Sequence, residues 1–398
     1  MISSSSRTEN FRYAIRNLVR AAEEVERAGR EVSYFNIGDP QVYGFHPPAH
    51  VVETVARASR DKFTGYTHSA GLPEARAAVA SYATALGAPT VPGEVLITSG
   101  ASEAADLLLT ALVNPGDEVL LPAPGYPIYA AILHKLGAVP RYYKLNDADN
   151  WLPSPAEMRS LVSARTRALV LINPNNPTGA VTPDALTAAM IEVAAERNLL
   201  VIADEVYREL CFGNQPTASS VIAREMSVPL VTLESLSKTH LIPGWRIGWM
   251  RFTCAEKMPD LLRAVGSLAD GRLCSPTLTQ YAVRPALEGS KSFQHEFVSE
   301  IRKRRDTAVA HVNRIEKLSC AVPEAAFYLM IKVNELIEDS DEAFVLQLLK
   351  DTGILVVHGS GFGTDPRLGY FRMVYLAEEE ALDKAFGAIS RFMSRRSR

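Results

Sequence analysis

The sequence predicts an α/β fold with a mainly parallel central sheet sandwiched by helices, plus a smaller α+β domain. Between about residues 95 and 252, short β-branched apolar runs alternate with longer stretches rich in Ala, Leu and Glu. This alternation is typical of a parallel sheet covered by helices on both faces. Runs such as Leu169-Val170-Leu171-Ile172 are continuously apolar, as expected of strands buried on both sides.

The larger domain is expected to alternate strands with helices along the chain. Strands are predicted over 95–98, 118–121, 139–143, 168–172, 199–203, 230–233 and 247–252. Helices are predicted over 102–113, 126–136, 154–162, 183–197 and 259–268. Ser102 is the expected N-cap of the first of these helices, and Pro183 is expected in the first turn of another.

After Ser290 the pattern changes and predicts the smaller domain. A charged helix is expected over 297–318, strands over 326–333, 354–357 and 371–376, and a final helix from residue 378. Near the start, 7–30 reads as an amphipathic helix with Leu18, Ala22 and Val25 on one face. We expect this helix to pack on the smaller domain. The predicted boundaries are 1–46 (arm and part of the small domain), 47–289 (large domain) and 290–398 (small domain).

Composition excludes several classes of protein. The 398 residues carry 42 basic and 45 acidic side chains, a formal charge of −3, which predicts neither a nucleic-acid nor a membrane partner. No apolar run approaches the roughly 18 residues that span a bilayer. The four cysteines are scattered, which fits a reducing cytoplasm. None of the histidines has metal-ligand spacing, so no metal is expected.

Lys238 stands in the segment Ser235-Leu236-Ser237-Lys238-Thr239, with Arg246 following in Gly244-Trp245-Arg246. A solvated surface lysine would explain Lys238 taken alone. A lysine among small hydroxyl residues, followed by an arginine, also fits an enzyme that uses pyridoxal phosphate (PLP). In such an enzyme the amine forms a Schiff base with the cofactor aldehyde, and the guanidinium holds the cofactor phosphate.

Two loops that follow predicted strands carry polar residues suited to the same cofactor. Asp204 ends an apolar run, where a carboxylate needs a partner; a pyridinium N–H and a structural arginine are the alternatives. Tyr207, three residues later, could reach a ring hydroxyl. Asn176, in the loop Asn173 to Gly179, lies where open α/β sheets place ligands, although the loop could simply connect strand to helix.

Three further positions complete a possible binding site. Ser99-Gly100-Ala101-Ser102 leads from a strand into a helix, so its backbone N–H groups could hold a phosphate. Tyr126 offers a flat face for stacking on a ring, or is a core aromatic residue. Arg372 lies among apolar neighbours and needs an anion, either a substrate α-carboxylate or a structural ion-pair partner.

These segments together resemble the fold-type-I, PLP-dependent class I/II aminotransferases, over nearly the whole chain, and within them the alanine aminotransferases most. The stretches that carry the resemblance are Tyr13 to Arg16, Asn36 to Pro40, Tyr66 with Gly71 to Arg76, Asn173 to Gly179, Ser235 to Lys238, Arg272 to Cys274, and His358 to Gly363. The first and the last two are the more specific to the alanine-type members.

The resemblance implies a role for each matching residue. Lys238 is implied as the Schiff base and proton carrier, Asp204 as the partner of the pyridine nitrogen, and Tyr126 as the stacking ring. Further implied contacts are Asn176 and Tyr207 to the ring hydroxyl; Gly100, Ala101, Ser102, Ser235 and Arg246 to the phosphate; and Arg372 and the Gly38 backbone to the substrate carboxylate. Tyr66 is implied to reach the phosphate of the other subunit, so a homodimer is expected.

The implied function is an amino-group transfer between an L-amino acid, alanine-like or glutamate, and a 2-oxo acid in a ping-pong cycle. Arg16 is the candidate cation for a distal carboxylate, with Tyr13 and Tyr129 in the same pocket. The alternative of a surface-exposed Arg16 remains open. The chain departs from its relatives at Ala325, Met330 and Ile331, and His68 stands at a position that varies with substrate, which puts the preferred amino acid in doubt.

Three other functions remain as alternatives. Another PLP reaction on the same fold, such as β-elimination or aminocyclopropane-carboxylate synthesis, would need the same motifs. An aminotransferase of a specialised biosynthetic pathway is the second alternative. A transcriptional regulator with an aminotransferase-like domain would need an added DNA-binding module, and the sequence offers neither the spare length nor a basic patch.

Overall fold

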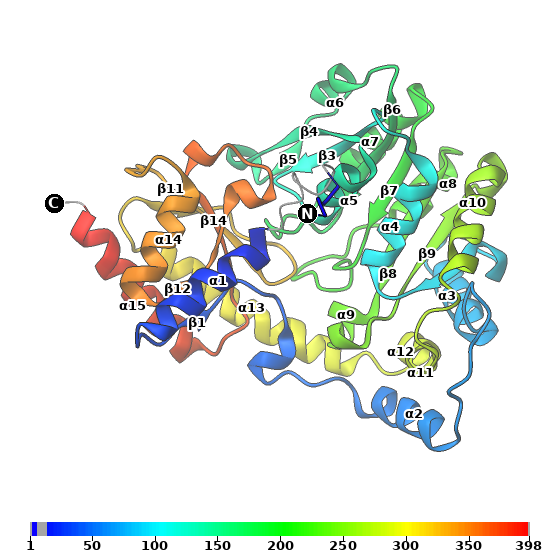
Figure 1. Ribbon diagram of the computed structural model, residues 1–398, viewed down its shortest axis with the longest axis horizontal. Helices are drawn as coiled ribbons and strands as arrows, with labels where there is room; N and C mark the ends of the chain where they lie inside the picture. Colours follow the sequence, from blue (N-terminus) through cyan, green and yellow to red (C-terminus); the bar gives the residue numbers. More distant parts are fainter. Residues whose placement is uncertain (1, 6–13, 397–398) are drawn as a thin grey trace.

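The central feature of the fold is an eight-stranded, mainly parallel sheet, as predicted (Figure 1). The computed structural model describes residues 2–5 and 14–396, with side chains in the first helix described from residue 18. In spatial order the strands are β2 (Val95–Thr98), β9 (Gly248–Thr253), β8 (Leu230–Ser235), β7 (Leu200–Asp204), β6 (Thr166–Ile172), β3 (Glu118–Ala123), β4 (Val139–Asn146) and β5 (Leu152–Pro153). From β8 through β4 neighbouring strands are parallel, whereas β9 runs antiparallel to both of its neighbours.

Helices cover both faces of this sheet because its strands are apolar on both sides. Val170 and Ile172 pack with α4 (Ala101–Leu112), α5 (Ile128–Leu136) and α10 (Pro259–Gly271). Leu169 and Leu171, from the same strand, pack on the opposite face with α6 (Pro155–Leu161), α7 (Asp184–Glu196) and α8 (Ser219–Glu225). The continuously apolar run over residues 169–172 therefore correctly predicted a strand that is buried on both faces of the sheet.

Helix starts differ from the prediction in three places. Gly100, not Ser102, is the N-cap of α4, with φ +81°. Ser102 lies inside the first turn and makes no capping bond. The predicted helix over 126–136 begins only at Ile128, after Pro127 at the N-cap position. Pro183 is likewise an N-cap residue and not inside the first turn of α7.

The smaller sheet is antiparallel, in the order β10 (Leu318–Cys320), β11 (Tyr328–Val333), β14 (Tyr370–Val374) and β13 (Val357–His358). It packs with α13 (Ser292–Val312), α14 (Asp341–Thr352) and α15 (Glu379–Arg396). The predicted helix over 297–318 therefore starts and ends too late, because Leu318 already pairs with Val333 in the sheet. The strand predicted over 354–357 is two short strands with different partners.

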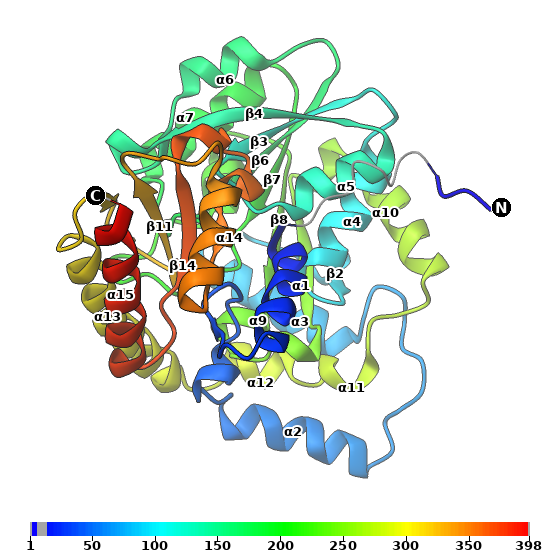
Figure 2. The same cartoon turned by 60° about the vertical axis from the view of Figure 1, so that its left-hand side comes forward.

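The N-terminal segment lies beside the smaller sheet. Leu18 and Ala22 of α1 (Ala14–Arg27) are buried in the same core, with Val25 packed against it, as the amphipathic pattern predicted. β1 (Ser33–Tyr34) then pairs in parallel with β12 (Ile354–Leu355). Both views show α1 next to α14, although the two helices lie far apart in the sequence (Figures 1 and 2).

The remaining helices surround one edge of the large sheet. They are α2 (Ala49–Arg60), α3 (Pro73–Ala85), α9 (Leu236–Thr239), α11 (Thr277–Gln280) and α12 (Val283–Glu288). α12 packs on α3 and, in Figure 1, α2 lies at the lower edge of the molecule. Within the described residues, no helix combines the length and apolar character that crossing a membrane would require.

Candidate active site

A cavity of about 1130 Å³ lies between the two sheets, at the carboxyl ends of the parallel strands. Open α/β sheets bind their ligands at this edge. Residues from the N-terminal arm, the large sheet and the small sheet all reach it. Of the predicted site residues, those lining the cavity are Gly38, Ala101, Ser102, Tyr126, Tyr129, Asn176, Asp204, Tyr207, Ser235, Lys238, Arg246 and Arg372.

Lys238 lies on the single-turn helix α9, directly after β8, and its Nζ donates a hydrogen bond to the Gly38 carbonyl at 2.6 Å. Burial lowers the pKa of this amine to about 8. Asp39 opposes that shift, whereas Arg372 and Arg246 add to it. A substantial neutral fraction near pH 7 makes Lys238 a far better nucleophile than a solvated surface lysine.

Asp204 ends β7 and is buried at the cavity wall. The Tyr129 hydroxyl donates to its Oδ2 at 2.7 Å, and the Val206 backbone N–H donates to Oδ1 at 3.3 Å. Burial raises the pKa of this carboxyl to about 6, against the lowering effect of the Tyr129 bond. No ion pair among the described residues includes Asp204, so the structural-arginine alternative is wrong here.

Arg372 is buried on β14 and lies between two aromatic rings. Its guanidinium carbon is 4.5 Å from the Tyr328 ring centre and 4.7 Å from that of Phe362. Nη1 donates to Asn176 Oδ1 at 3.1 Å, and Nη2 donates to the Asn36 carbonyl. These contacts hold the side chain in one orientation at the cavity.

Tyr207 comes from the loop after β7, and its buried hydroxyl lies 2.7 Å from the Tyr328 hydroxyl. Asn176 is presented by a loop whose other asparagines hold the loop together. Asn173 exchanges hydrogen bonds with the Thr182 backbone, and Asn175 Oδ1 accepts from Thr178. The two adjacent asparagines therefore have different tasks, and only Asn176 lines the cavity.

The N-terminus of α4 and Arg246 form one side of the cavity. A Cβ added to Gly100 would lie 2.4 Å from Arg246 Nη2, so only glycine allows the guanidinium so close. Arg246 itself is anchored by bonds from Nη1 to Pro243 O (2.8 Å) and from Nη2 to Ser99 O (3.1 Å). A helix N-terminus with a guanidinium beside it fits a phosphate dianion.

Some predicted residues do not reach the cavity in a single chain. Tyr66 is 85% exposed, between α2 and α3. Tyr13 lies outside the described residues, and so does the side chain of Arg16. Tyr129 lines the cavity as predicted, but its hydroxyl is engaged by Asp204 and not directed to a distal substrate group.

The departures from related sequences lie away from the cavity. Ala325 and Met330 are fully buried, and His68 Nδ1 accepts from the Ala70 backbone. None of the three lines the cavity, so these departures give no contact-based reason for an altered substrate preference. Asn36 and Phe362, which do contact Arg372, were not predicted as site residues. Only the folded structure brings these two residues to Arg372 on β14, so no local sequence pattern could have identified them.

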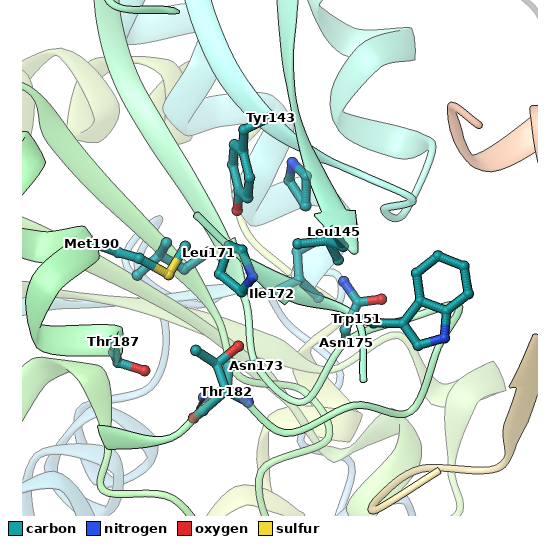
Figure 3. Close-up of a pocket in the computed structure, with 12 residues that line it drawn as sticks. Tyr143, Leu145, Trp151, Leu171, Ile172, Asn173, Asn175, Thr182, Thr187 and Met190 are labelled. Carbon is teal, nitrogen blue, oxygen red and sulfur yellow. Dashed lines mark hydrogen bonds between the residues drawn. The ribbon is translucent and has the colours of Figure 1, made fainter. Parts of the chain in front are cut away.

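A second, much smaller cavity lies on the face of the large sheet that packs with α6, α7 and α8 (Figure 3). Its volume is about 10 Å³, room for about one water molecule. It is lined by Tyr143, Trp151 and Met190, together with Asn173 and Asn175 from the loop after β6. It is a packing gap beneath the Asn173 loop and has no room for a cofactor.

Comparison with known proteins agrees with the geometry. The family model described as aminotransferase class I and II matches residues 30–389. A glutamate-pyruvate aminotransferase AlaA from Haemophilus influenzae is 33% identical, covering 99% of this chain and 98% of that one. An alanine aminotransferase from Mycobacterium tuberculosis is 32% identical, covering 98% and 92%. The solved alanine aminotransferase from Pyrococcus furiosus superposes with a TM-score of 0.95 at 34% identity, covering 99% of this chain and 100% of that one.

The chain therefore belongs to the aminotransferase class I and II family. It is a PLP-dependent aminotransferase of fold type I, and it resembles the alanine aminotransferases. Elimination or cyclopropane-forming chemistry is not favoured, since the relatives are named as aminotransferases. The residues at the cavity also fit PLP chemically: an amine of lowered pKa, a buried carboxylate and a helix N-terminus with a guanidinium beside it line the same cavity.

Proposed function

We propose that the chain transfers an amino group between L-alanine or L-glutamate and a 2-oxo acid, with the cavity as its active site. The observation that carries this proposal is the convergence of Lys238, Asp204 and Arg372 on one cavity. The names of the relatives support the pair of substrates. The same relatives support amino-acid metabolism, and a reducing cytoplasm remains our expectation for the compartment.

Different groups would hold the phosphate, the ring and the substrate. Arg246, the Ala101 backbone N–H, and the hydroxyls of Ser102 and Ser235 would bind the phosphate. Gly100, whose own N–H donates to the Thr98 carbonyl at 2.8 Å, allows the close approach of Arg246. Tyr126 stacks on the ring, and Asn176 and Tyr207 hydrogen-bond its hydroxyl. Arg372 binds the substrate α-carboxylate with the Gly38 backbone, which leaves the side chain of the substrate free to face the rest of the cavity.

When bound, PLP withdraws electrons from the substrate α-carbon and so weakens its C–H bond. Asp204 supports that withdrawal because its carboxylate keeps a proton on the ring nitrogen. Tyr129 in turn keeps Asp204 ionised and oriented. Lys238 would hold the cofactor through Nζ, and the same nitrogen would take and return the substrate α-proton, since its lowered pKa suits proton transfer near neutral pH.

The active protein is proposed to be a homodimer in which Tyr66 completes the partner's phosphate site. Tyr66 is too exposed to act within its own chain, and Val42, Phe63 and Leu273 are also exposed apolar side chains. Exposed apolar side chains of this kind are expected where a second subunit covers them. We also propose the boundaries 1–46, 47–289 and 290–398 for the arm, large domain and small domain.

The test is a panel of amino donors and 2-oxo acids with the purified protein. L-alanine plus 2-oxoglutarate is expected to yield pyruvate and glutamate, and alanine alone is expected to change the cofactor absorbance without sustained turnover. Release of ammonia and a 2-oxo acid from a donor with a β-leaving group, such as L-serine, in the absence of any acceptor would show an elimination instead. Turnover with neither alanine nor glutamate would place the chain in a specialised pathway.

A further inference from the structure

α9, the turn that carries Lys238, has little stability of its own. It is four residues long, and a single turn depends on contacts from elsewhere for its position. On its N-terminal side, Ser235 Oγ accepts from the Ser237 backbone at 3.4 Å. At its C-terminal end the His240 backbone N–H donates to the Leu236 carbonyl at 3.1 Å, while the carbonyl groups that follow depend on partners from outside the helix. The outside contacts at that end therefore help to set the position of Lys238.

Gln294 supplies one such contact. Its Nε2 donates to the carbonyl of Thr239, the last residue of α9, at 2.9 Å. The same nitrogen donates to Glu209 Oε2, also at 2.9 Å. Gln294 is 4% exposed, so water does not compete for either bond. The Gln294 side-chain amide therefore uses both of its hydrogens, one to bind α9 and the other to bind Glu209.

Glu209 belongs to the segment that begins with Asp204 at the end of β7 and includes Tyr207. Tyr82 donates to its Oε1 at 2.8 Å, and Lys291 Nζ lies 3.4 Å from its Oε2. Burial alone would raise the pKa of Glu209, but Lys291 and the hydrogen bonds from Tyr82 and Gln294 lower it. Glu209 is therefore a fixed carboxylate to which Gln294 is anchored.

Gln294 itself lies on α13, which extends from beside α12 to the smaller sheet (Figure 1). Its neighbour Phe293 packs its ring 5.3 Å from that of His240, the residue directly after α9. His240 is held by the Ala286 carbonyl at 2.9 Å, and burial lowers its pKa to about 4, so it stays neutral at physiological pH. The C-terminal end of α9 thus rests on α12 and α13.

We propose that Gln294 is a positioning residue for transamination: by binding Thr239 and Glu209 together, it fixes the Lys238 turn relative to Asp204 and Tyr207. The proposal rests on the role proposed for Lys238. Gln294 contacts neither substrate nor cofactor. Its effect comes from the placement of Nζ, and a displacement of about 1 Å can cost on the order of 100-fold in rate.

The experiment compares three holoenzymes. Gln294→Met keeps the volume and removes both donors, and Gln294→Glu opposes Glu209 with a second carboxylate. Tyr143→Phe is the matched control, since it also removes a buried hydrogen bond, from Tyr143 to the Val170 carbonyl at 2.8 Å, but lines only the small cavity of Figure 3. The readouts are Tm, the pH midpoint of the cofactor absorbance, kcat and KM.

Both Gln294 variants are expected to retain the cofactor, to shift the pH midpoint of its absorbance, and to lower kcat by about tenfold or more with little change in KM. Tyr143→Phe is expected to lower Tm while leaving midpoint and kcat unchanged. A lower Tm for Gln294→Met, with no change in kcat or in the pH midpoint of the cofactor absorbance, would overturn the proposal. If Gln294→Met does not fold, Gln294→Asn, one methylene shorter, tests the same contact with the same readouts.

Failure of the underlying function has a different signature. Borohydride reduction of the wild-type holoenzyme, followed by peptide mass spectrometry, reports which lysine carries the cofactor. A cofactor attached to a lysine other than Lys238 would overturn the proposed function itself. If the cofactor is attached to Lys238 but the Gln294 variants have the wild-type pH midpoint and kcat, only the positioning role is overturned.

Discussion

At the scale of single residues, the site is defined by two buried ionisable groups with opposite shifts. Burial lowers the pKa of Lys238 to about 8 and raises that of Asp204 to about 6. Each shift brings the group's pKa closer to neutrality, where proton transfer is most effective. The sequence predicted both residues, because a lysine among hydroxyl residues and an acid after an apolar strand are unusual.

The first residue-scale prediction concerns Lys238. The purified protein is expected to be yellow, and reduction with borohydride is expected to lock the cofactor onto Lys238. Lys238→Ala should bind the cofactor only noncovalently, because Nζ is the group that would form the covalent bond. Mass spectrometry of the reduced peptides measures this. No adduct, or an adduct on another lysine, would contradict the assignment.

The second prediction concerns Asp204 in the apoprotein. Its carboxyl pKa is about 6 when folded, against an ordinary 3.8, so the folded chain binds the proton more tightly between these values. Stability of the apoprotein should therefore fall as pH rises through roughly 4 to 6, by about 3 kcal/mol in total. Asp204→Asn should remove that fall.

Urea unfolding of apoprotein and of Asp204→Asn at a series of pH values measures the difference. At pH 7 the variant is expected to be the more stable apoprotein but a severely slower enzyme, by on the order of 10²–10³ in rate. Identical pH profiles for the two apoproteins would show that ionisation of Asp204 does not lower the stability of the folded apoprotein. Normal turnover in the variant would contradict its role toward the ring nitrogen.

The third prediction concerns the distal carboxylate of glutamate. Alanine lacks this group, so a cation that serves both substrates acts on only one of them. Arg16→Ala is expected to raise KM for glutamate and 2-oxoglutarate by about 10–150-fold, the value of one charge-assisted hydrogen bond, with little effect on alanine. Equal effects on both substrates, or none, would place the specificity elsewhere.

At the scale of elements, the sequence predicted strands better than it predicted ends. Apolar β-branched runs predicted seven of the eight strands of the large sheet, because burial on both faces leaves a strong local pattern in most of them. The two-residue strand β5 was not predicted, since it is too short to carry such a pattern. Helix ends depend on competition between caps, and Gly100 takes the α4 N-cap in place of Ser102. Ile354 to Val357 divides into β12 and β13 because their partners are distant in sequence, which no local pattern records.

The prediction at this scale concerns the start of α4. Gly100 has φ +81° and ψ 169°, a region that is essentially restricted to glycine and costs other residues about 1–3 kcal/mol. A Cβ there would also collide with Arg246. Gly100→Ala is therefore expected to weaken cofactor binding by about tenfold or more. Titration of apoprotein with PLP measures the affinity.

Gly93→Ala is the matched control. Gly93 precedes β2, and a Cβ added there meets nothing within 4 Å. Its affinity for PLP should equal that of the wild-type chain. Equal affinities for all three proteins would show that the α4 N-terminus does not hold the phosphate.

At the scale of the whole molecule, the prediction concerns the shared active site. If Tyr66 serves the partner's cavity, Lys238→Ala and Tyr66→Ala subunits complement each other. A mixed dimer then has one site with both defects and one intact site. An equal mixture, assayed at limiting PLP, is expected to recover about a quarter of wild-type activity, from statistical mixing of a symmetric dimer.

Two outcomes would contradict the shared site. The first is no recovery when mass spectrometry shows that mixed dimers have formed. The second is a monomeric mass by light scattering at concentrations where the enzyme is fully active. Each variant assayed alone provides the control, since neither pure dimer contains an intact site.

The parallel pairing of Ser33 and Tyr34 with Ile354 and Leu355 has a consequence for biosynthesis. The chain leaves the ribosome N-terminus first, so residues 33–36 emerge roughly 300 residues before their partners, a separation that makes such contacts slow to form. The strands from Val95 to Thr253 are complete long before then. The large sheet can therefore assemble during translation, while the newly made N-terminal strand waits unpaired and exposed to chaperones until the last segment is released.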